Sequence, residues 1–165
     1  MSCSTLQTWV SPTSQLDITT MRALIQRVSQ ASVTIDGTCV SSIKHGFLVL
    51  LGVKNGDTTA EADFIADKIL NLRVFEDDEG KMNRSLQDVN GELLVVSQFT
   101  LYGDARKGRR PSFTEAAPPE ISEPLYEYIV KQLKQVCPNV QTGRFGADMK
   151  VALVNDGPVT IMLEK

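Results

Sequence analysis

Apolar and polar residues alternate over two short segments, residues 22–28 and 31–35. A two-residue period is typical of a strand that buries one face. Asp36 and Gly37 come next, a dipeptide that favours a tight hairpin turn, and a further strand is expected over residues 38–43. The pattern therefore predicts an antiparallel start to the fold.

Two later segments contain consecutive apolar residues instead of an alternation. These are residues 47–53 and 92–99. Such runs are typical of strands that are covered on both faces, as in the centre of a sheet. Further strands are expected over residues 140–145, 150–154 and 159–163. Strands therefore outnumber helices in the predicted fold.

Two windows have helical periodicity. A helix is expected over about residues 59–72, because Thr58 and Glu61 have the spacing of a capping box. A second helix should follow Pro118–Pro119 and end before Pro138. The apolar positions expected to face the core are Ala62, Ile65, Ala66, Ile69 and Leu72 in the first helix and Leu125, Ile129, Leu133 and Val136 in the second.

These elements predict an α/β layered domain, in which two packed β-sheets carry the two helices on one outer face. The chain has 165 residues, 42% of them hydrophobic, which suits one domain with a core that needs no metal or disulfide. Residues 1–20 are rich in Ser and Thr and carry a single charge, and we interpret them as an extension. A natural tail, an organelle leader and a mis-set start all remain open for them. The folded domain is expected over residues 21–165.

Composition excludes several classes of function. A net charge of -3 argues against a protein that coats nucleic acid by bulk electrostatics. Cys3, Cys39 and Cys137 are odd in number and far apart, which is typical of a reducing, cytoplasmic setting. No apolar run has the length of a membrane span, and the single histidine, His45, gives no basis for a metal centre. We therefore expect no cofactor, no metal and no membrane partner.

A first candidate site lies where the strand over residues 92–99 ends. Ser97, Gln98 and Thr100 place polar side chains directly after consecutive apolar residues. A buried polar group without a partner costs about 1–3 kcal/mol, so these side chains either line a pocket or satisfy backbone groups at the strand end. The residues alone leave both interpretations open.

A second candidate is the segment Asn-Asp-Gly-Pro-Val-Thr at residues 155–160. Between two predicted strands, this composition favours a hairpin turn. A fixed peptide beside glycine can also present its carbonyl oxygens rigidly, which a side chain with several rotamers cannot do.

A third candidate is a cluster of cations in an otherwise acidic protein. The cluster comprises Arg106, Lys107, Arg109 and Arg110, all in a loop bounded by glycines. Cations at this density suit phosphate binding, and a merely solvated loop is the competing interpretation.

Residues 97–101 and 155–160 together resemble the two signature motifs of the D-aminoacyl-tRNA deacylases. Residues 23–28, 142–145 and 147–149 are similar to further segments of that family, in the same order. The resemblance implies a homodimeric, cytoplasmic enzyme. Its substrates would be D-aminoacyl-tRNA and glycyl-tRNA, from which it would hydrolyse the ester to the terminal adenosine.

The resemblance also implies roles for individual residues. A cis Gly157–Pro158 peptide of one subunit would enter the site of the other, hold the substrate amino group with its carbonyls and leave no room for an L side chain. The N–H groups of Phe99 and Thr100 would stabilise the oxyanion. No histidine is placed to activate the Thr100 hydroxyl, so a positioning role is expected, with the ribose 2′-hydroxyl assisting the attacking water. Ser97, Gln98 and Met149 would shape the pocket, Arg27 would brace the cis peptide, and Arg106, Lys107, Arg109 and Arg110 would bind tRNA.

Three alternatives remain at this point. A sister group that removes L-alanine has Thr at the position of Gly157, so Gly157 favours the D-specific branch. A non-catalytic module that binds RNA or the tRNA end would use only the basic loop. A Ser or Thr hydrolase of small esters would need Ser97 or Thr100 as a nucleophile, which a single, poorly placed histidine disfavours.

Overall fold

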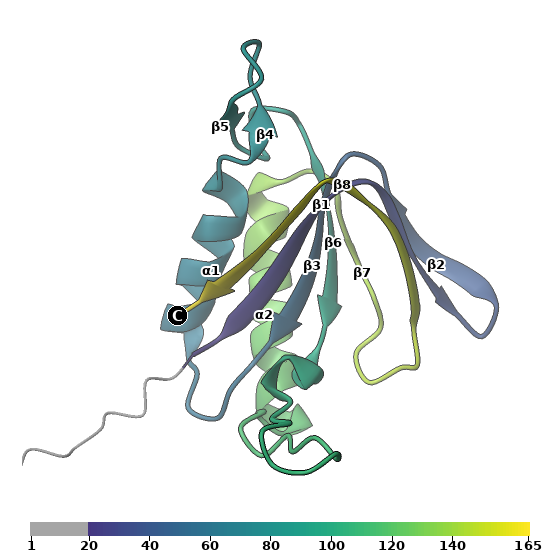
Figure 1. Ribbon diagram of the computed structural model, residues 1–165, viewed down its shortest axis with the longest axis vertical. Coiled ribbons are helices and arrows are strands. Elements are labelled where there is room, and N and C mark those ends of the chain that lie inside the picture. Colours follow the sequence, from purple (N-terminus) through teal and green to yellow (C-terminus); the bar gives the residue numbers. More distant parts are fainter. Residues whose placement is uncertain (1–19) are drawn as a thin grey trace, which may run out of the picture.

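The computed structural model describes residues 20–165, so the predicted extension lies outside it except for Thr20. No helix in this described part is long and apolar enough to cross a membrane. The elements in chain order are β1 (Arg22–Ile35), β2 (Thr38–Ile43), β3 (Gly46–Gly52), α1 (Thr59–Asn71), β4 (Phe75–Glu76), β5 (Met82–Arg84), β6 (Glu92–Ser97), the 3₁₀ helix η1 (Phe99–Tyr102), α2 (Pro119–Val136), β7 (Val140–Thr142) and β8 (Lys150–Glu164) (Figure 1).

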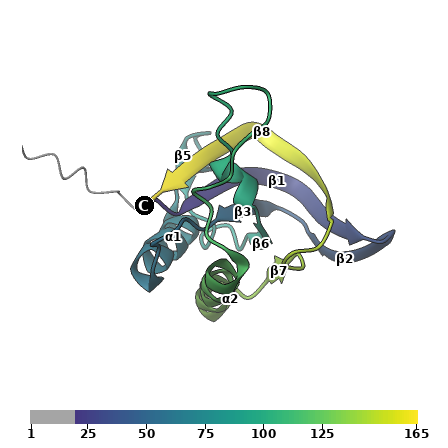
Figure 2. The same ribbon diagram turned by 90° about the horizontal axis from the view of Figure 1, so that it is seen from below.

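The α/β class is confirmed. The hydrogen bonds form one six-stranded sheet in the order β2-β1-β3-β6-β7, with β8 paired to β1, and a separate two-stranded ribbon, β4-β5. We expected two packed sheets, whereas the second sheet of the described residues is only this short ribbon. The pairs β3-β6 and β6-β7 are parallel, so each needs a crossover, and α1 and α2 lie in these connections. Both helices therefore cover the same face of the sheet (Figure 2).

The central strand β3 is buried on both faces, as its run of apolar residues predicted. Phe47, Val49 and Leu51 belong to the main core with the helices. Leu48 belongs to a second apolar cluster, which also takes in Val33 of β1. The curvature of the long strands thus brings distant parts of one sheet together on the face away from the helices (Figure 2).

Two long strands replace pairs of predicted short ones. β1 runs without interruption over Arg22–Ile35, and β8 over Lys150–Glu164. The hairpin turn favoured by the composition of residues 155–160 is therefore absent from the structure. The segment instead lies within β8, which stays antiparallel to β1 on both sides of a change in register. Pairing to β1 on both sides of the segment outweighs the local preference of Asp-Gly-Pro for a turn.

The helices begin and end close to where the sequence places them. Thr58 caps α1, and the reciprocal contact with Glu61 completes the predicted capping box. α2 ends at Val136, but 50% of this side chain is exposed, so its assignment to the core is wrong. β6 ends at Ser97, two residues earlier than expected, because η1 begins at Phe99. β7 covers only Val140–Thr142 of the predicted strand over residues 140–145.

Candidate functional site

A cavity of about 520 Å³ opens beyond the end of β6. Ser97 pairs with Leu51 in the parallel β3-β6 ladder, so both strands end at the same edge of the sheet, where α/β folds commonly bind ligands. Four of the predicted site residues line this cavity: Ser97, Gln98, Phe99 and Met149. The remaining lining residues are Leu51, Val53, Val96, Ala116, Ala117, Pro119, Ser122, Phe145, Gly146, Ala147, Asp148 and Val151.

The passage from β6 into η1 fixes one wall of the cavity. The N–H of Gln98 donates to the Leu51 carbonyl at 2.8 Å, so the chain stays attached to β3 at the turn. Phe99 and Thr100 follow in the first turn of η1, where N–H groups have no intrahelical acceptor. Thr100 is exposed and does not line the cavity, and its hydroxyl accepts a hydrogen bond from the Gln98 side-chain amide. This contact suits a positioning role for Thr100.

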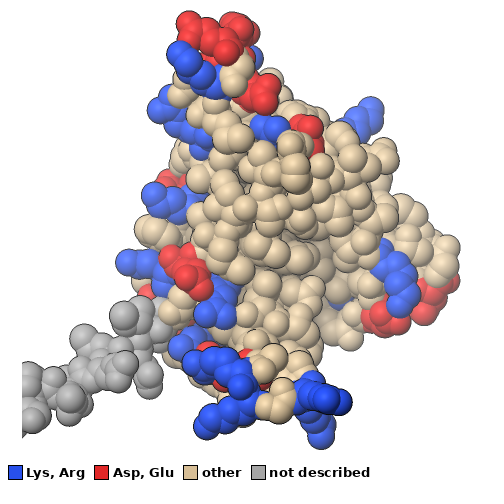
Figure 3. All heavy atoms as spheres, in the orientation of Figure 1, with Lys and Arg blue, Asp and Glu red and all other residues tan. Residues whose placement is uncertain are grey.

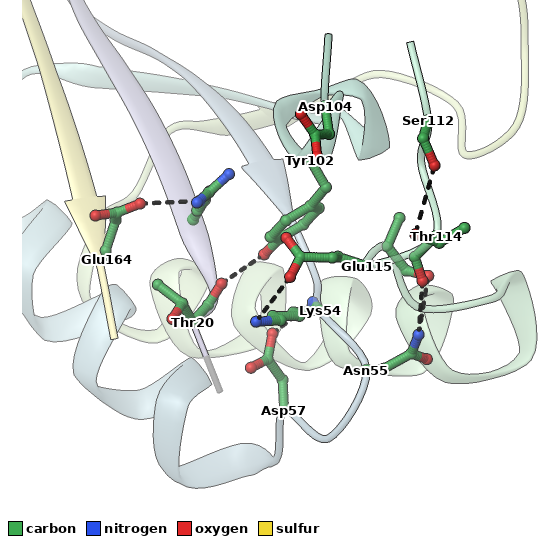
Figure 4. A network of polar contacts seen from close by, with 12 residues as sticks. Thr20, Lys54, Asn55, Asp57, Tyr102, Asp104, Ser112, Thr114, Glu115 and Glu164 are labelled. Carbon is green, nitrogen blue, oxygen red and sulfur yellow. Dashed lines mark hydrogen bonds and ion pairs between the residues drawn. The ribbon is translucent and has the colours of Figure 1, made fainter. Parts of the chain in front are cut away.

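A second wall is held by polar contacts to the turn between β3 and α1 (Figure 4). The Lys54 ammonium lies 3.4 Å from the Glu115 carboxylate, and the N–H of Ala117 donates to Val53 at 2.9 Å. Asp57 orders that turn by accepting a hydrogen bond from the N–H of Lys54 at 2.6 Å. Burial raises the pKa of Asp57 to about 6. The apolar wall of the cavity is thus anchored to a buried carboxylate.

The Gly157–Pro158 peptide is cis and lies in a bulge of β8. Thr160 pairs with Gln26, and Asn155 pairs with Val28. Residues 156–159 therefore lie opposite a single residue of β1. The Asn155 side-chain amide donates to the Thr160 hydroxyl at 2.9 Å, which closes the base of the bulge and leaves Gly157 and Pro158 exposed.

Arg27 is the β1 residue that faces this bulge, and its side chain is 6% exposed. The guanidinium donates to the Asp156 carbonyl at 3.3 Å and to the Val74 carbonyl at 2.7 Å. It also lies 3.3 Å from the Asp156 carboxylate and 4.0 Å from that of Glu76. The bulge carbonyl that accepts from Arg27 belongs to Asp156, the residue before Gly157, so Arg27 holds the base of the bulge, and among the described residues it makes no hydrogen bond to the carbonyl of Gly157 or Pro158.

The bulge and the cavity of one chain are far apart. Leu51 pairs with both Ser97 and Ala23, which places the end of β6 level with Ala23. Arg27 lies four residues further along β1, or roughly 13 Å, and β8 lies three strands from β6, or about 14 Å. Accordingly, Gly157 and Pro158 do not line the cavity.

The basic loop is closed at its base and exposed at its tip. Asp104 and Ser112 exchange backbone hydrogen bonds of 2.8 and 2.9 Å. Arg106 makes two side-chain contacts with the Asp104 carboxylate, at 2.8 and 2.7 Å, and these hydrogen bonds hold the pKa of Asp104 at about 2. Among residues 20–165, no ion pair is formed by Lys107, Arg109 or Arg110. Lys and Arg side chains gather at this lower end of the molecule (Figure 3).

Comparison with known proteins shows to which family the chain belongs. The sequence profile of the D-Tyr-tRNA(Tyr) deacylase family matches residues 24–164. The chain belongs to this family. It is 62% identical over 144 residues to a D-aminoacyl-tRNA deacylase of Roseiflexus castenholzii, a match that spans 87% of this chain and 92% of the relative. It is 59% identical over 145 residues to one of Exiguobacterium sibiricum, spanning 88% of this chain and all of the relative.

Solved structures agree with this family fold. A structure titled c-Myc DNA unwinding element binding protein superposes with a TM-score of 0.83 at 46% identity, covering 87% of this chain and 98% of that one. A probable eukaryotic D-amino acid tRNA deacylase superposes with a TM-score of 0.77 at 18% identity, covering 88% of this chain and all of that one. At that identity the second likeness concerns the fold alone.

Several residues of the cavity carry no signal that marks them as a site. Ala116, Ala117 and Val53 resemble core residues in the sequence, and only the folding of residues 113–117 against the β3–α1 turn brings them to the cavity. Phe145 and Ala147 lie within segments that resemble the family, but their residue types alone indicate packing. Titratable or polar side chains would have indicated a site in the sequence, and these residues have none.

Proposed function

We propose that this chain hydrolyses the ester bond of D-aminoacyl-tRNA, and also of glycyl-tRNA, to release the free amino acid and tRNA. Membership of the D-Tyr-tRNA(Tyr) deacylase family is the observation that carries the proposal. Relatives named D-aminoacyl-tRNA deacylase share about 60% of its residues over most of the chain. Residues 21–165 form the deacylase domain, which acts in the cytoplasm as a homodimer and needs no metal or cofactor.

The cavity beside η1 holds the terminal adenosine with its amino acid. Water attacks the ester carbonyl, and the N–H groups of Phe99 and Thr100 stabilise the oxyanion that develops. The tetrahedral intermediate collapses with cleavage of the bond to the ribose oxygen, which takes up a proton. The ribose 2′-hydroxyl assists the water, because the described residues place no histidine in the cavity. Ser97, Gln98 and Met149 shape the space around the reacting group.

Chirality is read by the Gly157–Pro158 bulge of the second subunit. Two features support this assignment: the bulge is exposed, and it lies roughly 19 Å from the cavity of its own chain by strand spacing. An L side chain would collide with main-chain atoms that cannot turn away, whereas glycine has no side chain to exclude. Discrimination therefore comes from steric exclusion, and glycyl-tRNA is admitted as a consequence.

Single-turnover deacylation of D-tyrosyl-tRNA and L-tyrosyl-tRNA tests the proposal. The wild type should cleave only the D ester. Thr100→Ala should retain turnover, because a positioning hydroxyl is not a nucleophile, and Pro158→Ala should lower the rate on the D ester. Cleavage of both esters, or complete loss of turnover in Thr100→Ala, would contradict the proposed mechanism.

A binding module without catalysis is the second candidate, favoured only by the exposed basic loop. It predicts that plain tRNA binds, that neither ester is cleaved and that neutralising Arg106 and Arg109 abolishes binding. Substitution of Gly157 or Pro158 would then leave the affinity for tRNA unchanged. The same set of variants therefore separates the two functions.

A further inference from the structure

Two aromatic side chains stand exposed at the rim of the cavity. Phe99 is 56% exposed and Phe113 is 37% exposed, although both are large and apolar. Their ring centroids lie 5.2 Å apart with an interplanar angle of 74°, so they form an edge-to-face pair. Phe99 also lines the cavity. An aromatic surface therefore continues outward from the proposed site of the terminal adenosine.

Two contacts hold Phe113 in place, one through its ring and one through its carbonyl. A Cβ placed on Gly103 would lie 3.1 Å from the Phe113 ring, so this ring packs closely on the backbone at the end of η1. The Phe113 carbonyl accepts a hydrogen bond from the N–H of Ala116 at 3.1 Å, and Ala116 belongs to the cavity wall. Phe113 is thus held by the same segment that shapes the cavity.

The basic loop adjoins the pair along the chain. Ser112, which closes the basic loop against Asp104, is the residue before Phe113. Asp104 neutralises Arg106, and within residues 20–165 no ion pair engages Lys107, Arg109 or Arg110, so these three cations remain for a ligand. Figure 3 shows Lys and Arg side chains gathered over this end of the molecule. Exposed aromatic rings next to unpaired cations are how proteins bind single-stranded nucleic acid.

We propose that Phe99 and Phe113, together with Lys107, Arg109 and Arg110, bind the nucleotide that precedes the terminal adenosine of the RNA. Its base stacks on the aromatic pair, and the phosphate that joins it to the adenosine contacts the cations. This subsite rests on the proposed function, which places the terminal adenosine in the adjoining cavity. A nucleotide suits the surface because one unit supplies both a π-face and a negative charge.

Equilibrium binding of two uncharged probes tests the subsite. The probes are adenosine and the dinucleotide cytidylyl-adenosine, which adds one base and one phosphate. Phe113→Leu should weaken binding of the dinucleotide roughly 5- to 150-fold, the range set by stacking on one aromatic residue, and leave adenosine binding unchanged. Phe113→Tyr should restore the affinity, because it restores the aromatic face. Met82→Ala removes a side chain that is 52% exposed on β5 and serves as the matched control, with no expected effect.

The phosphate contact has its own readout. Neutralising Lys107, Arg109 and Arg110 together as glutamines should weaken dinucleotide binding at low salt and reduce its dependence on salt, because the cations no longer attract the single phosphate. Adenosine has no phosphate, so its binding should not change. An unchanged salt dependence of dinucleotide binding would overturn the assignment of these cations.

The outcomes separate the subsite from the proposed function. Equal losses for adenosine and the dinucleotide in Phe113→Leu, or failure of Phe113→Tyr to restore binding, would overturn the subsite. Dissociation of the dimer by Phe113→Leu, measured by sedimentation, would assign the aromatic pair to a subunit contact and overturn it as well. If no aminoacyl ester is cleaved but the dinucleotide still depends on Phe113, the subsite stands and the proposed function fails.

Discussion

Replacement of Arg27 by leucine should both destabilise the fold and slow the reaction on the D ester. The guanidinium links the β8 bulge to Val74 by hydrogen bonds, and the four oxygen atoms around it belong to Asp156, Val74 and Glu76. Leucine keeps part of the apolar stem but removes every donor. The bulge then loses its attachment to the segment before β4.

The expected loss of stability depends on how well water can replace each contact that Arg27 makes. The Asp156 and Glu76 side chains are 45% and 60% exposed, so their carboxylates are readily hydrated when the arginine is removed. Val74 is only 5% exposed, and its carbonyl would lose a donor in a buried site at a cost of about 1–3 kcal/mol. With about 1 kcal/mol for the bonds to Asp156, the expected loss is about 2–4 kcal/mol.

Denaturant unfolding and single-turnover deacylation of D-tyrosyl-tRNA measure the two effects. A loss of 2–4 kcal/mol corresponds to a fall in Tm of roughly 5–15 °C for a domain of this size. The rate should fall at least about 10-fold at temperatures where the variant remains folded. A displacement of about 1 Å in a group that positions the substrate can lower a reaction rate about 100-fold. Arg27→Lys keeps the charge but cannot bridge the same acceptors, so its rate should also fall.

Arg84→Leu is the matched control. Arg84 pairs with Asp78 at 2.8 Å, but both side chains are exposed, so the expected loss is below about 1 kcal/mol without an effect on the rate. A stable Arg27→Leu variant that cleaves the D ester at the wild-type rate would refute the reasoning. The bulge would then hold its shape without Arg27.

Two further predictions concern Gly157 and Asp57. Gly157 has φ +116°, and a Cβ there would lie 2.9 Å from Cγ2 of Val159 and 3.0 Å from Nη2 of Arg27. Gly157→Ala should therefore cost about 1–3 kcal/mol in unfolding free energy and slow D-ester cleavage, whereas Gly80→Ala, at φ +76° with open space, should leave that rate unchanged. Equal effects of the two substitutions on cleavage would show that the contacts with Val159 and Arg27 are irrelevant to the rate. Burial raises the pKa of Asp57 from 3.8 to about 6, so its contribution to stability is present below pH 3.8 and is lost as the pH rises through 6. The free energy of unfolding of Asp57→Asn should therefore rise relative to that of the wild type as the pH goes from 4 to 7.5. The rise should be at most about 3 kcal/mol, at about 1.4 kcal/mol per pKa unit. A difference between the two proteins that does not vary with pH would contradict the burial argument.

Local signals predicted the helices and the first hairpin well. Thr58 and Glu61 specify the start of α1 through contacts three residues apart, and Asp36 and Gly37, both at positive φ, form the expected turn. The error at residues 155–160 has the opposite origin. Asp-Gly-Pro favours a turn locally, but β8 pairs with β1 on both sides of it, so long-range hydrogen bonds convert the turn into a bulge.

The candidate site was predictable only where it carries polar residues. Ser97 and Gln98 stood out because they interrupt an apolar run, and both line the cavity. Ala116 and Phe145 come from segments far apart in the sequence, and their apolar side chains indicate only burial. The exposed pair of Phe99 and Phe113 likewise depends on how the loop closes, because a strand ending at Phe99 would have buried that side chain.

A mixed-dimer experiment tests most directly whether the two halves of the site come from different subunits. One chain carries Ala147→Trp, which fills the cavity, and the other carries Gly157→Ala, which alters the bulge. Each homodimer should be folded and should cleave D-tyrosyl-tRNA far more slowly than the wild type. When the two are refolded together in equal amounts, half of the dimers are mixed and hold one intact site, so about a quarter of wild-type activity should return. A mixture that forms mixed dimers and stays inactive would contradict a bulge that serves the partner's cavity.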